Sequence, residues 1–256
     1  MDKKTLTEED IKLRFITPSI TNAGWTNKLI RMEYYFTDGR VIFQGNVHAR
    51  QKGKKADYLL HSSPNHPIAI VEAKDNTKPL GGGMQQAMEY AQILDIPFAY
   101  SSNGDGFLEH DFLTGKEREL TLEDFPSPES LYKRLVEFKG FTPKELITIS
   151  QPFYSSPYTY EPRYYQRIAI NRTVEAIAKG QNRVLIVMAT GTGKTITAFQ
   201  IIHRLRTSGL KKKILYLADR NILIDQTMVQ DFKPFKKVMT KMQNAKIDSA
   251  FEVYMA

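Results

Sequence analysis

The sequence predicts an α/β protein in two parts, and three observations support this prediction. In the first part, residues 56–61 and 68–74 are strand-like segments separated by a turn-rich stretch and followed by a helical pattern. In the second part, the apolar run 184–188 leads into a glycine-containing loop and then a helix. Between the parts, the four prolines of residues 140–162 are typical of an extended connector. We therefore expect domains at residues 1–140 and 161–256, joined by a linker at residues 141–160.

Composition places the chain among ordinary globular proteins. Its 256 residues are 41% hydrophobic and 25% charged, and no apolar run approaches the ~18 residues of a membrane span. The charged N-terminus does not resemble a secretory signal, and the absence of cysteine excludes disulfides and thiolate metal sites. We therefore expect a cytoplasmic protein without a membrane partner.

The net charge of +8 is unevenly distributed. From residue 161 onward, 17 lysines and arginines face 7 acidic residues, whereas the first 160 residues carry a net charge of −2. This excess permits nucleic-acid binding by the second part, but a solvated basic surface is the alternative interpretation.

The first part alternates helical and strand patterns. Thr7 precedes three acidic residues and is expected to cap a helix that Pro18 ends or interrupts, and Trp25 is expected to anchor the core. Strands are expected at 29–36, 56–61, 68–74, 97–101 and within a hairpin at 107–113, with helices at 84–94 and 128–138.

Three residues of the central hairpin form a candidate catalytic site. Glu72 and Lys74 lie on the same side of their strand, because alternate side chains share a face. Asp57 lies on the neighbouring strand, which brings a second carboxylate to that face. Two carboxylates and an ammonium suit a divalent cation and a water held for attack on phosphate. The alternative is a salt-bridged or solvent-facing sheet edge.

Gln86 and Tyr90 follow on the next predicted helix. Their i, i+4 spacing lets both side chains reach one target, so they are candidates for the same site. A plain helix surface explains them equally well.

The second candidate site is a glycine-containing loop. Gly191 and Gly193 allow backbone N–H groups to approach phosphate, Lys194 supplies positive charge, and Thr195 is placed to bind Mg²⁺. Met188 stands where the usual eight-residue pattern begins with glycine. The alternative is a glycine turn with a surface lysine. Around the loop we expect a helix to about residue 178, a buried parallel strand at 184–188, a second parallel strand at 213–218 and a helix at 222–232.

Taken together, the motifs resemble the restriction (R) subunit of type I restriction-modification enzymes, in that family's order over nearly the whole chain. The matching residues are Thr7-Glu8, Ala23-Gly24-Trp25, Asp57-Tyr58, Glu72-Ala73-Lys74, Gln86-x-x-x-Tyr90, Phe98-Ala99-Tyr100, Asn103-Gly104, Tyr165-Gln166 and Thr190-Gly191-Thr192-Gly193-Lys194-Thr195. The resemblance implies a PD-(D/E)xK nuclease domain followed by a truncated RecA-like lobe of a superfamily 2 translocase.

The resemblance also implies roles for individual residues. Asp57 and Glu72 would bind Mg²⁺, with Ala73 and Glu8 as further metal-binding candidates, and Lys74 would position or activate the attacking water. The other implied assignments are Gln86 and Tyr90 as catalytic-site support, Gln166 as an adenine contact, and Arg163, Gly191, Thr192, Gly193, Lys194 and Thr195 as further ATP-binding residues.

One departure from the family pattern affects the motor. No acidic Asp-Glu-x-His motif follows Lys194 before the sequence ends at Ala256. We therefore expect an N-terminal fragment that does not hydrolyse ATP by itself, with a sheet edge and apolar surface uncovered.

The implied function is Mg²⁺-dependent cleavage of double-stranded DNA together with modification and specificity subunits, with ATP-driven translocation by the full-length subunit. A nuclease–helicase of DNA repair and a non-catalytic DNA-binding or assembly module are the alternatives.

Overall fold

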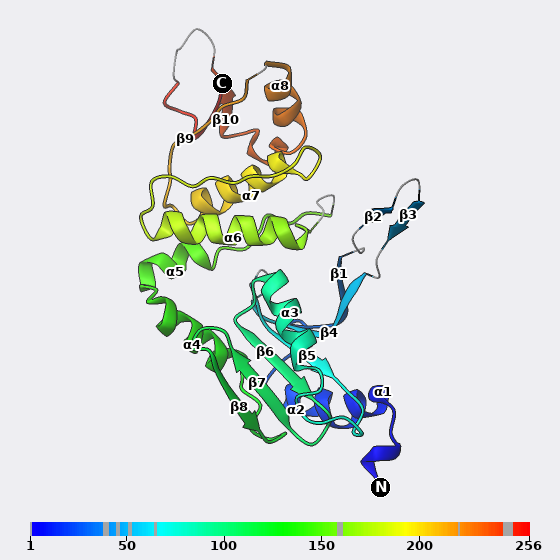
Figure 1. The fold of residues 1–256 in the computed structure, drawn as a ribbon. Coiled ribbons are helices and arrows are strands. Elements are labelled where there is room, and N and C mark those ends of the chain that lie inside the picture. Colours follow the sequence, from blue (N-terminus) through cyan, green and yellow to red (C-terminus); the bar gives the residue numbers. More distant parts are fainter. Residues whose placement is uncertain are drawn as a thin grey trace. The chain divides into compact units, whose positions relative to one another are not determined.

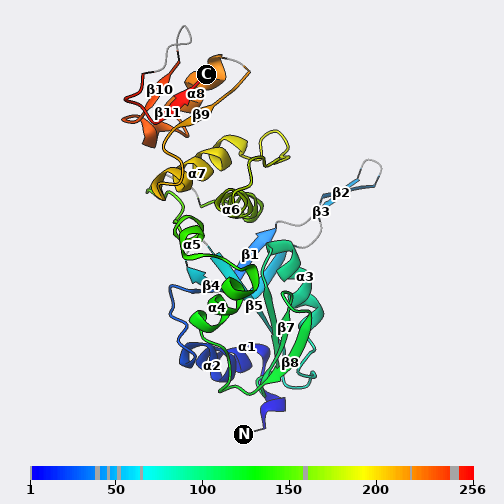
Figure 2. The same cartoon turned by 90° about the vertical axis from the view of Figure 1, so that its left-hand side faces the viewer.

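The computed structural model describes residues 2–37, 41–44, 47–50, 53–63, 66–157, 161–219, 221–242 and 248–256. The chain divides into two compact units, Met1–Phe141 and Thr142–Ala256, which are described separately (Figures 1 and 2). Among the described residues, none of the helices is long and apolar enough to cross a membrane. The centre of the turn-rich stretch between residues 61 and 68 and the end of the expected linker lie outside these residues.

The first unit is built on a six-stranded sheet with the order β1-β4-β5-β6-β7-β8. Only the β5–β6 pair is parallel. The strands are β1 (Ile30–Thr37), β4 (Lys54–Ser63), β5 (His66–Ala73), β6 (Phe98–Ser102), β7 (Phe107–Asp111) and β8 (Lys116–Leu120). A separate antiparallel pair, β2 (Val41–Gln44) and β3 (Val47–Arg50), lies between β1 and β4 in the chain (Figure 1). The hairpins expected at 56–74 and after residue 107 are confirmed.

Alternation along the central strands separates the two faces of this sheet. Tyr58, Val71 and Tyr100 pack in one core with side chains from the N-terminal helices, with Trp25 and with helix α4 (Pro128–Lys139). The opposite face of β5 and β6 is covered by helix α3 (Met84–Leu94), which buries Met84 and Ala87. The residues between those of the first core, including Leu59 and Ile70, are therefore assigned to the α3 face.

The N-terminal helical segment continues through Pro18, which we expected to end or interrupt it. It comprises α1 (Glu8–Ile11), a π-helical turn η2 (Lys12–Ile16) and α2 (Thr17–Asn22), after a short 3₁₀ turn η1 (Lys3–Thr5). A proline has no N–H group to donate to the preceding turn, and the wider π-turn before it accommodates this. Thr7 caps the segment as expected, in a reciprocal capping box with Asp10.

A buried ion-pair network joins α4 to β7. Glu109 is 1% exposed and accepts hydrogen bonds from both terminal nitrogens of Arg134, at 3.0 and 2.9 Å, and from Arg118 Nε at 2.8 Å. Arg134 also donates to Asp111 at 2.7 Å and lies over the Phe98 ring at 4.4 Å. These contacts supply hydrogen-bonded counter-charges to two carboxylates that are almost inaccessible to water.

The second unit contains four helices and a small parallel sheet within its described residues. The helices are α5 (Pro143–Ile149), α6 (Tyr164–Ala178), α7 (Lys194–Thr207) and α8 (Asn221–Val229), with a 3₁₀ turn η3 (Lys233–Phe235). The sheet has the order β10-β11-β9, with β9 at Ile214–Tyr216, β10 at Met239–Lys241 and β11 at Val253–Met255. Phe199 of α7 packs into the core of this unit with Phe232 and Phe235.

The buried strand expected at residues 184–188 is wrong. These residues adopt neither helix nor strand, and Val184, Leu185 and Val187 are 42%, 87% and 84% exposed. The parallel strand expected at 213–218 is confirmed as β9, but its described neighbour is β11. An apolar run becomes a strand only where a neighbouring strand completes its hydrogen bonds, and no described residue pairs with this one.

The extended connector expected between the parts is also wrong in its first half. Helix α5 occupies residues 143–149 because Thr142 and Glu145 form a capping box and Pro143 stands at the first helical position. Further along, the amide group of Gln200 on α7 pairs with both the N–H and the C=O of Tyr154, at 2.8 and 3.0 Å. These residues therefore pack as part of the second unit.

Replacing Arg134 is expected to destabilise the first unit strongly. Arg134→Met keeps the apolar stem but leaves Glu109 and Asp111 without their shared partner, at a cost of about 3–5 kcal/mol in the free energy of unfolding. Urea denaturation followed by fluorescence of Trp25, the single tryptophan and a core residue of this unit, measures the change. Lys133→Met, on an exposed side chain of the same helix, should change it by less than about 0.5 kcal/mol. Equal effects of the two substitutions would contradict this account.

Candidate functional site

The register of β4 with β5 places Asp57 beside Glu72. Tyr58 pairs with Val71 and Leu59 with Ile70, so the same antiparallel register puts Asp57 opposite Glu72. Opposite residues project to the same face of a sheet, here the one covered by α3. The backbone N–H of Asp57 donates to Glu72 Oε1 at 3.4 Å, and both residues are buried, at 7% and 1% exposure. The structure therefore brings the two expected carboxylates together.

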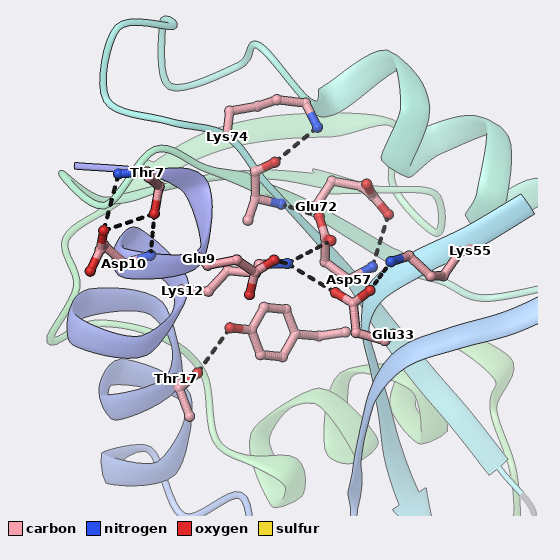
Figure 3. Close-up of polar contacts among 12 residues, drawn as sticks. Thr7, Glu9, Asp10, Lys12, Thr17, Glu33, Lys55, Asp57, Glu72 and Lys74 are labelled. Atoms are coloured by element: carbon pink, nitrogen blue, oxygen red, sulfur yellow. Dashed lines mark hydrogen bonds and ion pairs between the residues drawn. The ribbon is translucent and has the colours of Figure 1, made fainter. Parts of the chain in front are cut away.

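Lys74 lies where β5 ends, two residues beyond Glu72. Its Nζ donates to the carbonyl oxygen of Ala73 at 2.8 Å, and the N–H of Ala73 donates to Asp57 Oδ2 at 2.8 Å (Figure 3). Ala73 thus connects the aspartate to the lysine through its own peptide groups. The three residues expected to carry catalysis occupy one small region at the junction of β4 and β5.

Burial changes the acidity of the glutamate at this junction. Desolvation, reinforced by the nearby charge of Asp57, raises the pKa of Glu72 from 4.5 to about 8. A carboxyl group with such a pKa gains strongly from a bound cation, because the cation replaces the lost hydration of the ionised form. Two carboxylates and the carbonyl of Ala73 are hard oxygen donors of the kind that Mg²⁺ prefers, so the residues present fit this ion.

Glu8, the fourth expected metal-binding residue, begins helix α1. Partial burial and the charge of Asp57 raise the pKa of Glu8, so the two acids influence each other electrostatically. Among the described residues, however, no three acidic or histidine side chains are grouped closely enough to hold one metal ion. The structure therefore groups Asp57 with Glu72 but does not place Glu8 with them around a single position.

Two residues that the sequence analysis did not identify complete this region. Lys12, at the start of the π-helical turn, is 2% exposed and contacts Glu9, Glu33 and Asp57. Burial by itself lowers the pKa of Lys12, but the hydrogen bonds and charges of Glu9 and Asp57 outweigh it, and the net pKa is raised. No local motif marks Lys12 or Glu33 as part of this site, because the contacts of Lys12 with Glu33 and Asp57 join residues that are distant in sequence.

Glu33 has an unusual backbone conformation. Its φ of 52° lies in the left-handed region, which costs a residue with a side chain about 1–3 kcal/mol. In β1, Met32 pairs with Tyr58 and Tyr34 with Ala56, so Glu33 lies at the position opposite Asp57, where no pairing is formed. Strain of this kind is concentrated at functional sites.

Gln86 and Tyr90 lie on α3, the helix that covers the Asp57–Glu72 face. Gln86 Nε2 donates to the hydroxyl of Tyr90 at 3.2 Å, and the Tyr90 ring packs edge-on against Phe36 at 5.1 Å. Partial burial raises the pKa of Tyr90, and the charge of Glu72 adds to this shift. Gln86 and Tyr90 are therefore hydrogen-bonded to each other, and Tyr90 lies close enough to Glu72 to be affected by its charge.

The glycine loop of the second unit ends at the N-terminus of α7. Gly191 and Gly193 have φ values of 79° and 84°, a conformation that side chains disfavour. Lys194 and Thr195 begin the helix, whose free N–H groups favour anions. Lys194 Nζ lies 3.2 Å from the carbonyl oxygen of Ala189 and 3.4 Å from that of Met188, so its ammonium is folded over the loop.

Gln166 holds the same loop from helix α6. Its Nε2 donates to the carbonyl oxygen of Thr192 at 2.8 Å, and its Oε1 accepts from the N–H of Arg163 at 2.9 Å. A Cβ atom at Gly193 would approach Gln166 Nε2 to 2.3 Å, so a side chain there would displace the glutamine amide from its present position. The structure thus brings Arg163, Gln166 and the loop together, and both polar groups of the Gln166 amide have partners within the protein.

Comparison with known proteins finds a family model for the second part of the chain and relatives that cover nearly all of it. Residues 159–252 match the family described as "Type III restriction enzyme, res subunit". The chain is 49% identical, over its full length, to the "Type I restriction enzyme EcoAI endonuclease subunit" of Escherichia coli, of which it covers 32%. It is 28% identical to the EcoKI endonuclease subunit of Escherichia coli (strain K12), with 88% of this chain and 24% of that protein covered.

A solved structure agrees. It is named "The fragment structure of a putative HsdR subunit of a type I restriction enzyme from Vibrio vulnificus YJ016", and it matches this chain with a TM-score of 0.84 and 41% identity. The match covers 98% of this chain and 46% of the other. The chain spans a third or less of the length of the two curated relatives. By sequence and by structure, it belongs to the family of type I restriction enzyme endonuclease (R) subunits.

Proposed function

We propose that this chain supplies the DNA-cleaving site of a type I restriction complex, with a PD-(D/E)xK nuclease domain in its first unit. The observation that carries the proposal is the position of two buried carboxylates, Asp57 and Glu72, on adjacent strands with Lys74 two residues beyond. The substrate is double-stranded DNA, and modification (methyltransferase) and specificity subunits select it. Homology to subunits named as endonucleases of type I restriction enzymes supports restriction over DNA repair.

The residues of the junction have separate tasks in this proposal. Asp57, Glu72 and the carbonyl group of Ala73 would hold Mg²⁺, which when bound would neutralise charge developing on the scissile phosphate. Lys74 positions the attacking water, because its ammonium lies at the same junction and is held by Ala73. Gln86 and Tyr90 support this site from α3 and contact DNA.

We further propose that the glycine loop binds ATP and that the full-length subunit uses it for translocation along DNA. The left-handed glycines, the helix N-terminus and Lys194 together form a cradle suited to phosphate oxygens. Thr195 would contribute to holding Mg²⁺ there, and Gln166 and Arg163 lie beside the loop to contact the nucleotide. Recognition of adenine by Gln166 would require its amide to leave Thr192.

Loss of cleavage by three variants tests the nuclease proposal. Asp57→Ala, Glu72→Ala and Lys74→Ala, each in the full-length subunit assembled with its modification and specificity subunits, should reduce Mg²⁺-dependent cleavage of unmethylated plasmid by about a hundredfold or more. ATP hydrolysis should persist, since these residues lie outside the glycine loop.

Asp75→Asn is the matched control. Asp75 follows Lys74 directly in the sequence, but its carboxylate accepts a hydrogen bond from the backbone N–H of Thr77. This substitution should leave cleavage unchanged. Full cleavage by all three alanine variants would show that Asp57, Glu72 and Lys74 only stabilise the sheet. The chain would then be a non-catalytic DNA-binding or assembly module.

The free energy of unfolding of the first unit should decrease as the pH rises, and Glu72 should cause part of this decrease. Its pKa is raised from 4.5 to about 8 in the folded chain, so its contribution to stability is fully present below about pH 4.5 and is lost as the pH rises through about 8. Glu72→Gln is neutral throughout. In EDTA, the free energy of unfolding of the wild type relative to Glu72→Gln should therefore drop by up to ~4 kcal/mol between about pH 5 and pH 9.

Urea titrations with Trp25 fluorescence at the two pH values give this difference. Glu137→Gln, on an exposed part of α4, should show no pH-dependent difference from the wild type. A Glu72→Gln difference that is the same at both pH values would mean that Glu72 is not held in its neutral form.

A substitution in the glycine loop should impair ATP hydrolysis directly, whereas the substitutions at Asp57, Glu72 and Lys74 should impair DNA cleavage and spare ATP hydrolysis. Lys194→Ala in the full-length subunit should lower ATP hydrolysis by about a hundredfold, because it removes the charge aimed at the transferring phosphate. Lys212→Ala, an exposed lysine of the same unit, is the control. Melting monitored by Trp25 should be unchanged in both, and normal ATPase activity of Lys194→Ala would contradict the nucleotide proposal.

A further inference from the structure

Lys12 is a buried ammonium surrounded by carboxylates from three separate elements. Its Nζ lies 2.5 Å from Glu9 Oε1 on α1, 2.9 Å from Glu33 Oε1 on β1 and 3.3 Å from Asp57 Oδ1 on β4 (Figure 3). Among these partners only Asp57 belongs to the proposed metal site. The contact with Asp57 is also the longest of the three.

The strand registers explain why a cation is needed there. Glu33 lies opposite Asp57 across β1 and β4, and Asp57 lies opposite Glu72 across β4 and β5. Three acidic residues therefore occupy one row across three neighbouring strands. Like charges directly opposite each other repel, and the burial of Asp57 and Glu72 intensifies this repulsion. The ammonium of Lys12 lies between Glu33 and Asp57 in this row.

Lys74 is a second lysine whose ammonium contacts an oxygen atom of the proposed metal site. Asp57 Oδ1 is in contact with Lys12, Asp57 Oδ2 accepts from the N–H of Ala73, and the carbonyl of Ala73 accepts from Lys74. Two of the oxygens proposed to bind Mg²⁺ are thus each in contact with a lysine ammonium. A divalent ion at the junction would meet two positive charges, one of which, Lys74, is assigned to catalysis.

We propose that Lys12 is a positioning residue that acts as an internal counter-ion for Asp57 and yields that carboxylate to Mg²⁺. This inference rests on the proposed function of the junction. Before the metal binds, Lys12 holds Asp57 in place beside Glu72. When the metal binds, Lys12 keeps Glu9 and Glu33 as partners and gives up only its longest contact. Glu33 is held in a strained backbone conformation at the position where it can serve this purpose.

The charge of Lys12 makes the proposal testable without measuring cleavage. Lys12→Met keeps most of the apolar stem and removes the ammonium, which leaves Asp57 without its counter-ion until a metal arrives. The variant should therefore melt several degrees below the wild type in EDTA. Mg²⁺ should raise the melting temperature of the variant by at least twice the increase that it causes in the wild type. Its dissociation constant for Mg²⁺, measured by calorimetry, should fall about tenfold because a competing positive charge is gone.

Two further substitutions serve as controls on the same chain. Lys12→Arg retains the charge and should restore a melting temperature in EDTA near that of the wild type. Lys55→Met removes a lysine whose described contacts are an ion pair with Glu33 and a cation–π contact with Tyr35, and it should leave the Mg²⁺ response unchanged. Trp25 fluorescence reports melting of the first unit in every case.

The outcomes separate this inference from the function on which it rests. If Mg²⁺ stabilises the wild type but not Asp57→Asn, the metal site stands, and an unchanged or weaker Mg²⁺ response in Lys12→Met then overturns the role of Lys12 alone. Such a result would mean that Lys12 has only a structural role and stabilises the metal-free and the metal-bound protein equally. If Mg²⁺ has no effect on the wild type, both the metal site and the inference are overturned.

Discussion

The register between β4 and β5 is the constraint on which the proposed catalytic site depends. Tyr58 pairs with Val71, and this register alone puts Asp57 beside Glu72 on the face covered by α3. A slip of one residue would turn one carboxylate to the opposite face, because side chains alternate along a strand. The register is strongly specified, since β5 is buried on both faces from Ile68 to Ala73. Core packing thus also sets the geometry of the site.

This dependence explains which features of the first unit could be predicted from the sequence. The hairpin, the alternation of Glu72 with Lys74 and the helix carrying Gln86 and Tyr90 all follow from periodicity and turn residues close in sequence. Lys12 and Glu33 could not be found in this way. They reach Asp57 only through the folded sheet and a π-helical turn, and no pattern within one element indicates such a meeting.

The second unit shows a different limit of sequence reasoning. Residues 184–188 have the composition of a buried strand, yet three of their side chains are exposed. Apolar composition predicts that a segment prefers burial, whereas strand formation also needs a partner, and the described sheet consists of β9, β10 and β11 alone. The loop that follows was predictable, because glycine conformations and a helix N-terminus are local properties. The expected connector failed for the opposite reason, since prolines also begin helices, as Pro143 does.

Two buried acidic clusters lie among the described residues of the first unit, and their cationic partners indicate different roles. Glu109 is held by the planar guanidinium of Arg134 through two hydrogen bonds of fixed geometry, an arrangement that resists rearrangement. Asp57 is instead held by Lys12, a point charge on a flexible stem with other carboxylates within reach. A permanent bidentate partner would exclude a metal ion from Asp57. A lysine with alternative partners lets the same carboxylate be stable before the metal binds and available afterwards.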